Sequence, residues 1–276
     1  MVDISLMTKA DIPFAAELSE MERWGDLEVD YHRIYGFEPE GCFIAREDER
    51  RVGMITSITY GDYAFLANLI VSRDCRGRGI GTELMKRVIY YVRSRDIENI
   101  ELDGEIRAVP IYRRLGFKDK YLSLRFLRRP SEYESTTVTV NVPTVDRVVE
   151  FDHTMTGLKR GRVIRRFCEE FARDVYVVGD GGIDAYAIVR PAERGVRCIG
   201  PAVAKNAEDF ESLIRAIVGR YHDHALTIGV PEVSRDAVTI LLAHGFCYTQ
   251  PSLRMYVGDR LDYEKHICAI TAPNKG

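Results

Sequence analysis

The most informative stretch of the chain reads Leu69-Ile70-Val71-Ser72-Arg73-Asp74-Cys75-Arg76-Gly77-Arg78-Gly79-Ile80-Gly81-Thr82. An apolar strand predicted over 63–71 ends in it, and a helix predicted over 79–95 begins in it, with apolar residues at helical spacing. Glycines let the intervening turn approach a ligand closely, and the free N–H groups at a helix start favour an anion. Because two arginines add positive charge, the stretch predicts a phosphate-binding turn. A solvated basic turn is the plainer alternative.

The glycine spacing narrows the choice of phosphate ligand. A dinucleotide fingerprint needs G-x-G-x-x-G, whereas Gly77, Gly79 and Gly81 give G-x-G-x-G and position 82 is Thr. The Gly-Lys-Ser/Thr of a P-loop is absent. The pattern that fits is R-x-x-G-x-G, from Arg76 to Gly81.

A second motif follows at 108–117, with the sequence A-V-P-I-Y-R-R-L-G-F. Together with R-x-x-G-x-G, this motif resembles the GCN5-related N-acetyltransferase (GNAT) family. The family has the pattern A-x-x-L-Y-x-x-L-G-F in the corresponding segment. The resemblance implies that the turn cradles the pyrophosphate of acetyl-CoA and that Tyr112 protonates the departing coenzyme A thiolate. A phenol with an unperturbed pKa near 10 carries its proton at neutral pH, so this role is chemically sound. The alternative makes Tyr112 an ordinary core residue.

The resemblance also implies which residues hold acetyl-CoA. The strand splays from its neighbour near Leu69, Ile70 and Val71, whose main chain would bind the pantetheine arm and the acetyl carbonyl, and one N–H there could serve as oxyanion donor. The phosphate cradle would comprise Arg76, Gly77, Arg78, Gly79, Ile80, Gly81 and Thr82.

Two positions depart from the family pattern. Glu105 stands where many members have an asparagine that contacts the cofactor, which puts that contact in doubt. Phe65 stands where some members have a glutamate base. A base must then come from elsewhere, through water or from Glu101, Asp103 or Glu22, each of which could equally be an ordinary surface carboxylate.

The order of predicted elements recurs after a polar stretch at 128–136, which indicates two domains, 1–130 and 137–276. Sliding the chain by 129 residues puts Phe117 on Phe246 and Gly116 on Gly245. The whole chain resembles a two-domain subgroup with a divergent GNAT-like second half, through Trp24-Gly25, Glu38-Pro39-Glu40-Gly41, Phe151-Asp152, Gly200-Pro201 and Arg254-Met255-Tyr256. The expected fold class is α/β (α+β), tandem GNAT-like folds with mixed, mostly antiparallel sheets flanked by helices.

The second copy lacks the residues that carry chemistry in the first. Glu208 and Phe210 fall opposite Gly79 and Gly81, and Leu241 falls opposite Tyr112. Lys205 falls opposite Arg76. We therefore expect the second domain to be non-catalytic and to form one wall of the acceptor site.

Composition excludes several other classes of protein. A formal net charge of −3 disfavours binding to nucleic acid. The chain has no apolar run long enough for a membrane span and no signal-peptide pattern at its N-terminus. Six scattered cysteines and six histidines show no metal-ligand spacing and no disulfide framework. We expect a cytoplasmic protein without a metal, and the sequence does not specify its oligomeric state.

The sequence thus predicts an acetyl-CoA-dependent N-acetyltransferase in which a small-molecule or peptide amine attacks the thioester directly. One alternative is a non-enzymatic acyl-CoA-binding sensor or interaction module, and a second is a nucleotide-binding oxidoreductase. Five acidic residues either face the acceptor entrance and favour a cationic amine, or form a solvated helical surface: Glu20, Glu22, Asp26, Glu28 and Asp30.

Overall fold

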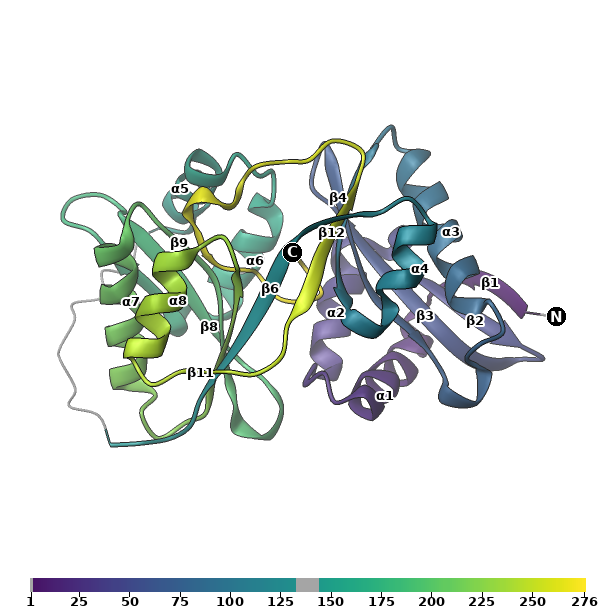
Figure 1. Ribbon diagram of the computed structural model, residues 1–276, viewed down its shortest axis with the longest axis horizontal. Coiled ribbons are helices and arrows are strands. Elements are labelled where there is room, and N and C mark those ends of the chain that lie inside the picture. The colour runs from purple at the N-terminus through teal and green to yellow at the C-terminus, as the bar shows by residue number, and fades with distance from the viewer. Residues whose placement is uncertain (1, 133–143) are drawn as a thin grey trace.

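Strand pairing joins both halves of the chain into one thirteen-stranded sheet in the computed structural model, which describes residues 2–132 and 144–276. Most neighbouring strands are antiparallel, and the parallel pairs are β4 with β5 and β9 with β10. Helices cover both faces of the sheet (Figure 1). The architecture is the mixed, mostly antiparallel sheet with flanking helices that the sequence predicts.

The strands are β1 (Val2–Leu6), β2 (Phe43–Glu47), β3 (Arg50–Thr59), β4 (Tyr63–Val71), β5 (Asn99–Glu105), β6 (Lys118–Arg128), β7 (Val175–Val178), β8 (Ala185–Pro191), β9 (Arg197–Ala204), β10 (Leu226–Pro231), β11 (Cys247–Tyr248), β12 (Ser252–Val257) and β13 (Ile267–Ala269). The helices are α1 (Ile12–Glu22), α2 (Glu28–Phe37), α3 (Ile80–Arg93), α4 (Val109–Arg114), α5 (Val145–Thr156), α6 (Gly161–Glu170), α7 (Ala207–Arg220) and α8 (Arg235–Ala243). A strand that the sequence predicts at 138–142 lies outside the described residues.

The two halves exchange equivalent strands in the middle of the sheet. The 129-residue shift carries β5 onto 228–234 and β6 onto 247–257, the region of β10 and of β11 and β12. β5 does not pair with β6; it pairs with β12, and β6 pairs with β10. β6 and β12 also pair with each other and run side by side through the centre of Figure 1. The domain boundary between residues 130 and 137 remains a prediction. Strands from the two sides of that boundary pair within one sheet.

Three apolar clusters hold the helices on the sheet. One packs α3 and α4 on a face of the first half, and a second packs α7 and α8 on the second half. The third contains residues of α1 and α2 together with residues of α5 and α6, so it spans both halves. No helix in the described part of the chain is long and apolar enough to cross a bilayer.

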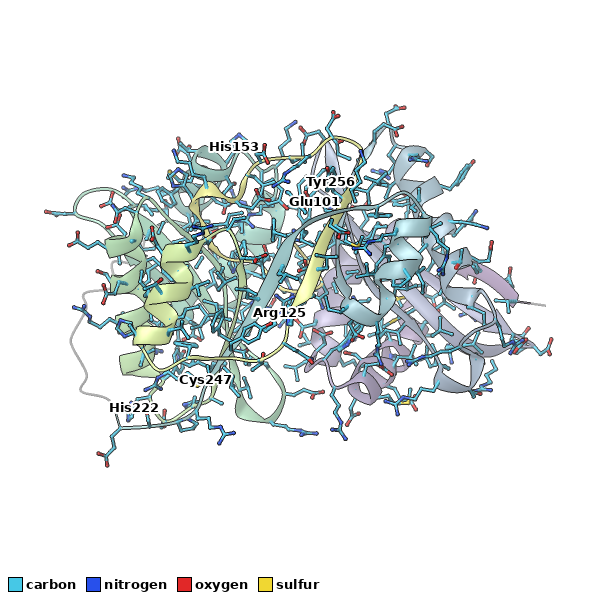
Figure 2. All side chains as sticks on the ribbon, viewed as in Figure 1. Glu101, Arg125, His153, His222, Cys247 and Tyr256 are labelled. Atoms are coloured by element: carbon cyan, nitrogen blue, oxygen red, sulfur yellow. The ribbon has the colours of Figure 1, made fainter. Side chains whose placement is uncertain are left out.

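Arg254 on β12 is the buried cation at the centre of the exchange, with a side chain only 1% exposed. Its Nε lies 2.7 Å from Asp103 Oδ1 and its Nη1 lies 3.2 Å from Glu101 Oε2, both on β5. Its guanidinium also lies 4.8 Å from the centre of the Phe65 ring on β4. Figure 2 shows Glu101 in this central region of the sheet. β12 is therefore fixed to the first half by charge as well as by the strand ladder.

We predict that Arg254→Met destabilises the fold by about 3–5 kcal/mol, because it leaves two buried carboxylates without their shared cation. Denaturant unfolding at pH 7 measures the change. The matched control is Arg260→Met, which removes a guanidinium whose partner Asp262 is exposed, and this should cost less than about 1 kcal/mol. Equal losses in the two variants would contradict the role of Arg254.

Candidate active site

The candidate site opens where β4 and β5 separate. Their parallel pairing stops at Leu66 and Leu102, although both strands continue. On the other side of β4 the pairing with β3 shifts register, so that Asn68 and Leu69 together oppose Ile55. This β-bulge holds Asn68 at φ 53°, and its Nδ2 donates to Thr56 Oγ1 at 3.0 Å. The bulge and the separation expose main chain of β4 to a cavity.

This first cavity, which we call the cofactor cavity, has a volume of about 500 Å³. Every residue that lines it comes from the first half of the chain, between Glu22 and Arg114. Ten of the residues that the sequence assigns to acetyl-CoA binding or catalysis line it: Leu69, Ile70, Val71, Arg76, Gly77, Gly79, Ile80, Gly81, Thr82 and Tyr112. Arg78 is the exception, because its guanidinium turns away and pairs with Glu47 on β2.

The glycine turn adopts a backbone that other residues resist. Gly77 and Gly79 have φ of 75° and 84°, in the left-handed region, and Gly79 is the N-cap of α3. No side chain caps this helix start. Gly79, Ile80, Gly81 and Thr82 all line the cofactor cavity, so the uncapped end of the helix is available to an anionic ligand.

Three arginines converge on Glu22 beside this turn. Arg76 Nη2 and Arg107 Nη2 each lie 2.6 Å from a Glu22 oxygen, and Arg73 Nε lies at 3.3 Å. Burial acts to raise the pKa of Glu22, but hydrogen bonds from Arg107 and Arg76 outweigh it and lower the pKa. Glu22 is therefore an anion that holds cations at the cavity wall. Arg107 belongs to neither sequence motif, so the sequence alone does not indicate it.

Tyr112 projects from α4 toward the cofactor cavity. Its ring packs so closely on β5 that a Cβ at Gly104 would lie 2.6 Å from Tyr112 Cε2. Burial, and secondarily the charge of Glu105, raises the pKa of the phenol above its usual value of 10. Across residues 2–132 and 144–276 its hydroxyl has no protein hydrogen-bond partner, so its proton remains available to a ligand. The side chain is therefore a protonated phenol facing the cavity.

The structure shows where Glu105 and Phe65, the two departures from the family pattern, lie. Glu105 lines the cofactor cavity, where it accepts hydrogen bonds from Trp24 Nε1 at 2.7 Å and Arg107 Nε at 2.5 Å. Its charge is therefore compensated beside the expected anionic ligand. Phe65 is fully buried, as an apolar residue should be.

The three carboxylates considered as bases are all bound by cations. Glu101 is not on the surface: it is 1% exposed and accepts from Lys120 Nζ at 2.7 Å. Arg254 and Arg125 lower the pKa of Asp103 despite its burial. Glu22 holds the three arginines described above. None of the three is free to accept a proton from an amine.

A second cavity, which we call the acceptor cavity, has a volume of about 490 Å³ and adjoins the first. The two share five lining residues: Trp24, Ala67, Asn68, Asp103 and Glu105. Its other walls come from both halves, with the α1–α2 loop on one side and the segments 190–193, 227–229 and 272–275 on the other. Arg125, near the centre of Figure 2, also lines it. A molecule bound there would contact Asn68 in the bulge of β4.

The equivalent region of the second half has different geometry. Helix α7 starts at Asn206, whose Oδ1 accepts from the Asp209 N–H at 3.0 Å and so caps the helix. Phe210 and Leu241 are buried in the second apolar cluster, and Lys205 pairs with Asp184. Within the described residues no group of three or more His, Cys, Asp or Glu side chains is arranged to hold a metal ion.

Comparison with known proteins gives the class of enzyme, an acyltransferase, and its family. Residues 12–117 match the acetyltransferase (GNAT) family and residues 148–267 match an acetyltransferase (GNAT) domain. The chain belongs to the GNAT family, with two GNAT domains, and is an acetyltransferase enzyme. The duplication inferred from the sequence is thereby confirmed. Enzymes of this fold use acetyl-CoA.

Three similar proteins illustrate the relationship. Holothin acyltransferase of Pseudoalteromonas sp. (strain SANK 73390) is 25% identical, over 89% of this chain and 84% of its own. A Pyrococcus horikoshii protein classed as an acetyltransferase has a crystal structure that superposes with a TM-score of 0.82 at 22% identity, covering 100% of this chain and 96% of that one. A tandem GNAT protein from the clavulanic acid biosynthesis pathway superposes at 0.65 with 13% identity, covering 94% and 100%.

The left-handed backbone of the turn gives a test of the geometry. We predict that Gly79→Ala lowers the free energy of unfolding by about 1–2 kcal/mol, because a Cβ disfavours φ of 84° although no atom blocks it. In Gly36→Ala the new Cβ also meets open space, but the site is helical, so the variant should be stabilised by roughly 0.5–1 kcal/mol. Denaturant unfolding of both variants is the measurement, and a shift of the same sign in both would contradict the assignment.

Proposed function

We propose that this enzyme transfers the acetyl group of acetyl-CoA to a primary amine by direct attack, with acetyl-CoA in the cofactor cavity and the amine in the acceptor cavity. The observation that carries the proposal is the single cavity that contains both the uncapped glycine turn of α3 and the hydroxyl of Tyr112. A phosphate-binding end and a proton donor within one cavity suit a long thioester substrate.

The roles follow from the contacts. The N–H groups at the start of α3, with Arg76, would hold the pyrophosphate, and the main chain of β4 from Leu69 to Val71 would hold the pantetheine arm and polarise the acetyl carbonyl. Tyr112 would give its proton to the departing sulfur. A raised pKa keeps the phenol protonated, and a thiolate is the base that receives the proton.

The second domain, in this proposal, binds no acetyl-CoA and contributes to the acceptor site. Its helix α7 is capped by Asn206 where α3 is open, and it carries Leu241 where the first half has Tyr112. Its segments 190–193 and 272–275 form walls of the acceptor cavity. Amine-dependent release of free thiol from acetyl-CoA tests the proposed reaction, and a binding stoichiometry of one per chain by calorimetry tests the assignment of a single site.

Arg76→Ala should weaken binding of coenzyme A roughly 10- to 100-fold and leave binding of a pantetheine fragment nearly unchanged. A charge-assisted hydrogen bond contributes about 1.5–3 kcal/mol, and only coenzyme A carries the pyrophosphate. Calorimetric titration with both ligands is the measurement. Arg78→Ala removes the same charge two residues away, outside the cavity, and should cost less. Equal losses for coenzyme A and pantetheine would show that Arg76 does not hold phosphate.

Tyr112→Phe should lower kcat about 10²- to 10⁴-fold with little change in acetyl-CoA affinity, since a positioned acid contributes in that range and the ring that packs on Gly104 is retained. The loss should appear in kcat and kcat/KM together. It should shrink for a thioester whose leaving thiol has a lower pKa, because that thiolate needs the proton less. Wild-type turnover with a rate-limiting chemical step would remove Tyr112 from the mechanism and leave water as the donor.

A further inference from the structure

Asp26 lies in the wall of the acceptor cavity, on the loop between α1 and α2. Its Oδ2 accepts hydrogen bonds from Ser19 Oγ at 3.1 Å and from the Tyr31 hydroxyl at 3.4 Å. Its Oδ1 accepts from Asn274 Nδ2 at 3.0 Å. A carboxylate offers about four lone-pair positions, two on each oxygen. Oδ1 therefore retains one position for a ligand.

Three other carboxylates that line this cavity are already paired with cations. Asp30 contacts Arg33 at 2.9 Å and Lys275 at 3.6 Å, and Asp103 lies against Arg254 and Arg125. Glu105 is paired with Arg107.

In contrast, the direct hydrogen bonds to Asp26 come from neutral groups, and it has no ion-pair partner among the residues that the structure describes. Glu193 also lacks one there, but none of the described side chains donates a hydrogen bond to its carboxylate, whereas three hold Asp26. Asp26 is therefore a carboxylate of the cavity wall that neighbouring side chains hold in place but that has no direct ion pair.

We propose that Asp26 binds the ammonium group of a small aliphatic amine acceptor and takes up the proton that this group must lose before attack; the inference rests on the proposed function. The amine would enter the acceptor cavity as a cation and would supply the charge that the cavity lacks. An anion at this place favours aliphatic amines, which are charged at neutral pH, over neutral acceptors.

The size of the cavity favours a small molecule over a protein. About 490 Å³ lies in the range of small-ligand sites. The loop that carries Asp26 is hydrogen-bonded to the second half, because Glu193 N donates to Gly25 O at 3.4 Å. Asn274, which holds Oδ1, also belongs to the second half. Both halves thus fix the position of the carboxylate.

The charged surroundings leave Asp26 able to accept a proton. Burial raises its pKa from 3.8 to about 6; Lys275 opposes that rise and Asp30 adds to it. The groups that face it are Ser19 from α1, Asp30 and Tyr31 from α2, and Asn274 and Lys275 from the segment 272–275. A rise of this size makes proton uptake roughly 100-fold more favourable than at an ordinary aspartate. Above about pH 6 the group is ionised and can hold an ammonium.

The reaction balances with the groups named. The ammonium gives one proton to Asp26 Oδ1, from which it passes to solvent. The nitrogen lone pair then forms the C–N bond at the thioester carbon, and the C–S bond breaks with its electrons on sulfur. The thiolate takes the proton of Tyr112, and the second proton of the nitrogen restores Tyr112 through solvent. The net products are the amide, the free thiol and one proton.

The test compares two kinds of acceptor in the full-length enzyme. Asp26→Asn keeps the size of the side chain and should lower kcat/KM about 10²- to 10⁴-fold for tyramine and putrescine. The loss should be below tenfold for aniline, which arrives neutral and has no ammonium to bind. In the wild type the kcat/KM for tyramine should fall below about pH 6, because protonated Asp26 cannot hold the cation, and this acid limb should be absent in the variant. The control is Glu28→Gln on the exposed face of α2, which should change neither value.

Calorimetry with acetyl-CoA shows in parallel that each variant is folded. Equal losses for tyramine and aniline, or an acid limb that persists in Asp26→Asn, would overturn the inference. So would acetylation of peptides but of none of these small amines, which would leave the proposed function standing. Absence of acetyl-CoA binding in the wild type would overturn the proposed function and this inference together.

Discussion

The arrangement of both cavities depends on one buried guanidinium, that of Arg254. It is shared by Asp103 and Glu101 on β5, and a cation without these partners could not be buried at this depth. The same strand carries Asp103 and Glu105, which line both cavities. By fixing β12 against β5, Arg254 sets the position of the wall that the two cavities share. A residue of the second half thus helps to position a wall of the proposed site.

The strand exchange explains why two similar halves form one enzyme. The cofactor cavity is lined by the first half alone, whereas the acceptor cavity needs segments of both. Since β5 pairs with β12 and β10 pairs with β6, neither half completes its own sheet. The two halves therefore cannot separate without breaking hydrogen bonds between paired strands. A cavity lined by both halves thus keeps a fixed geometry.

Local patterns in the sequence predict many of the residues that line the cofactor cavity. They do not predict how strands of the two halves pair with each other. The bounds of β4 follow from its apolar run, and the turn at 76–81 follows from its glycines, because each depends on neighbours close in sequence. The position of Glu101 does not follow, because its partners Arg254 and Lys120 reach it only once β12 lies between β5 and β6. The sequence assigns Arg78 to the same phosphate cradle as Arg76, yet Arg78 pairs with Glu47 on another strand.

Helices α3 and α7 lie at corresponding places in the two halves and differ in how they begin. Both helices are fourteen residues long, begin after a strand and pack on the same kind of sheet. The start of α3 has a glycine in the left-handed region and, among the described residues, no side-chain cap, so its first N–H groups remain available to a ligand. At the start of α7 the Asn206 side chain accepts a hydrogen bond from the N–H of Asp209, the third residue of the helix. Capping stabilises a helix and occupies N–H groups that an anion would use, so under the proposed function the uncapped start of α3 gives up some helix stability for a binding site.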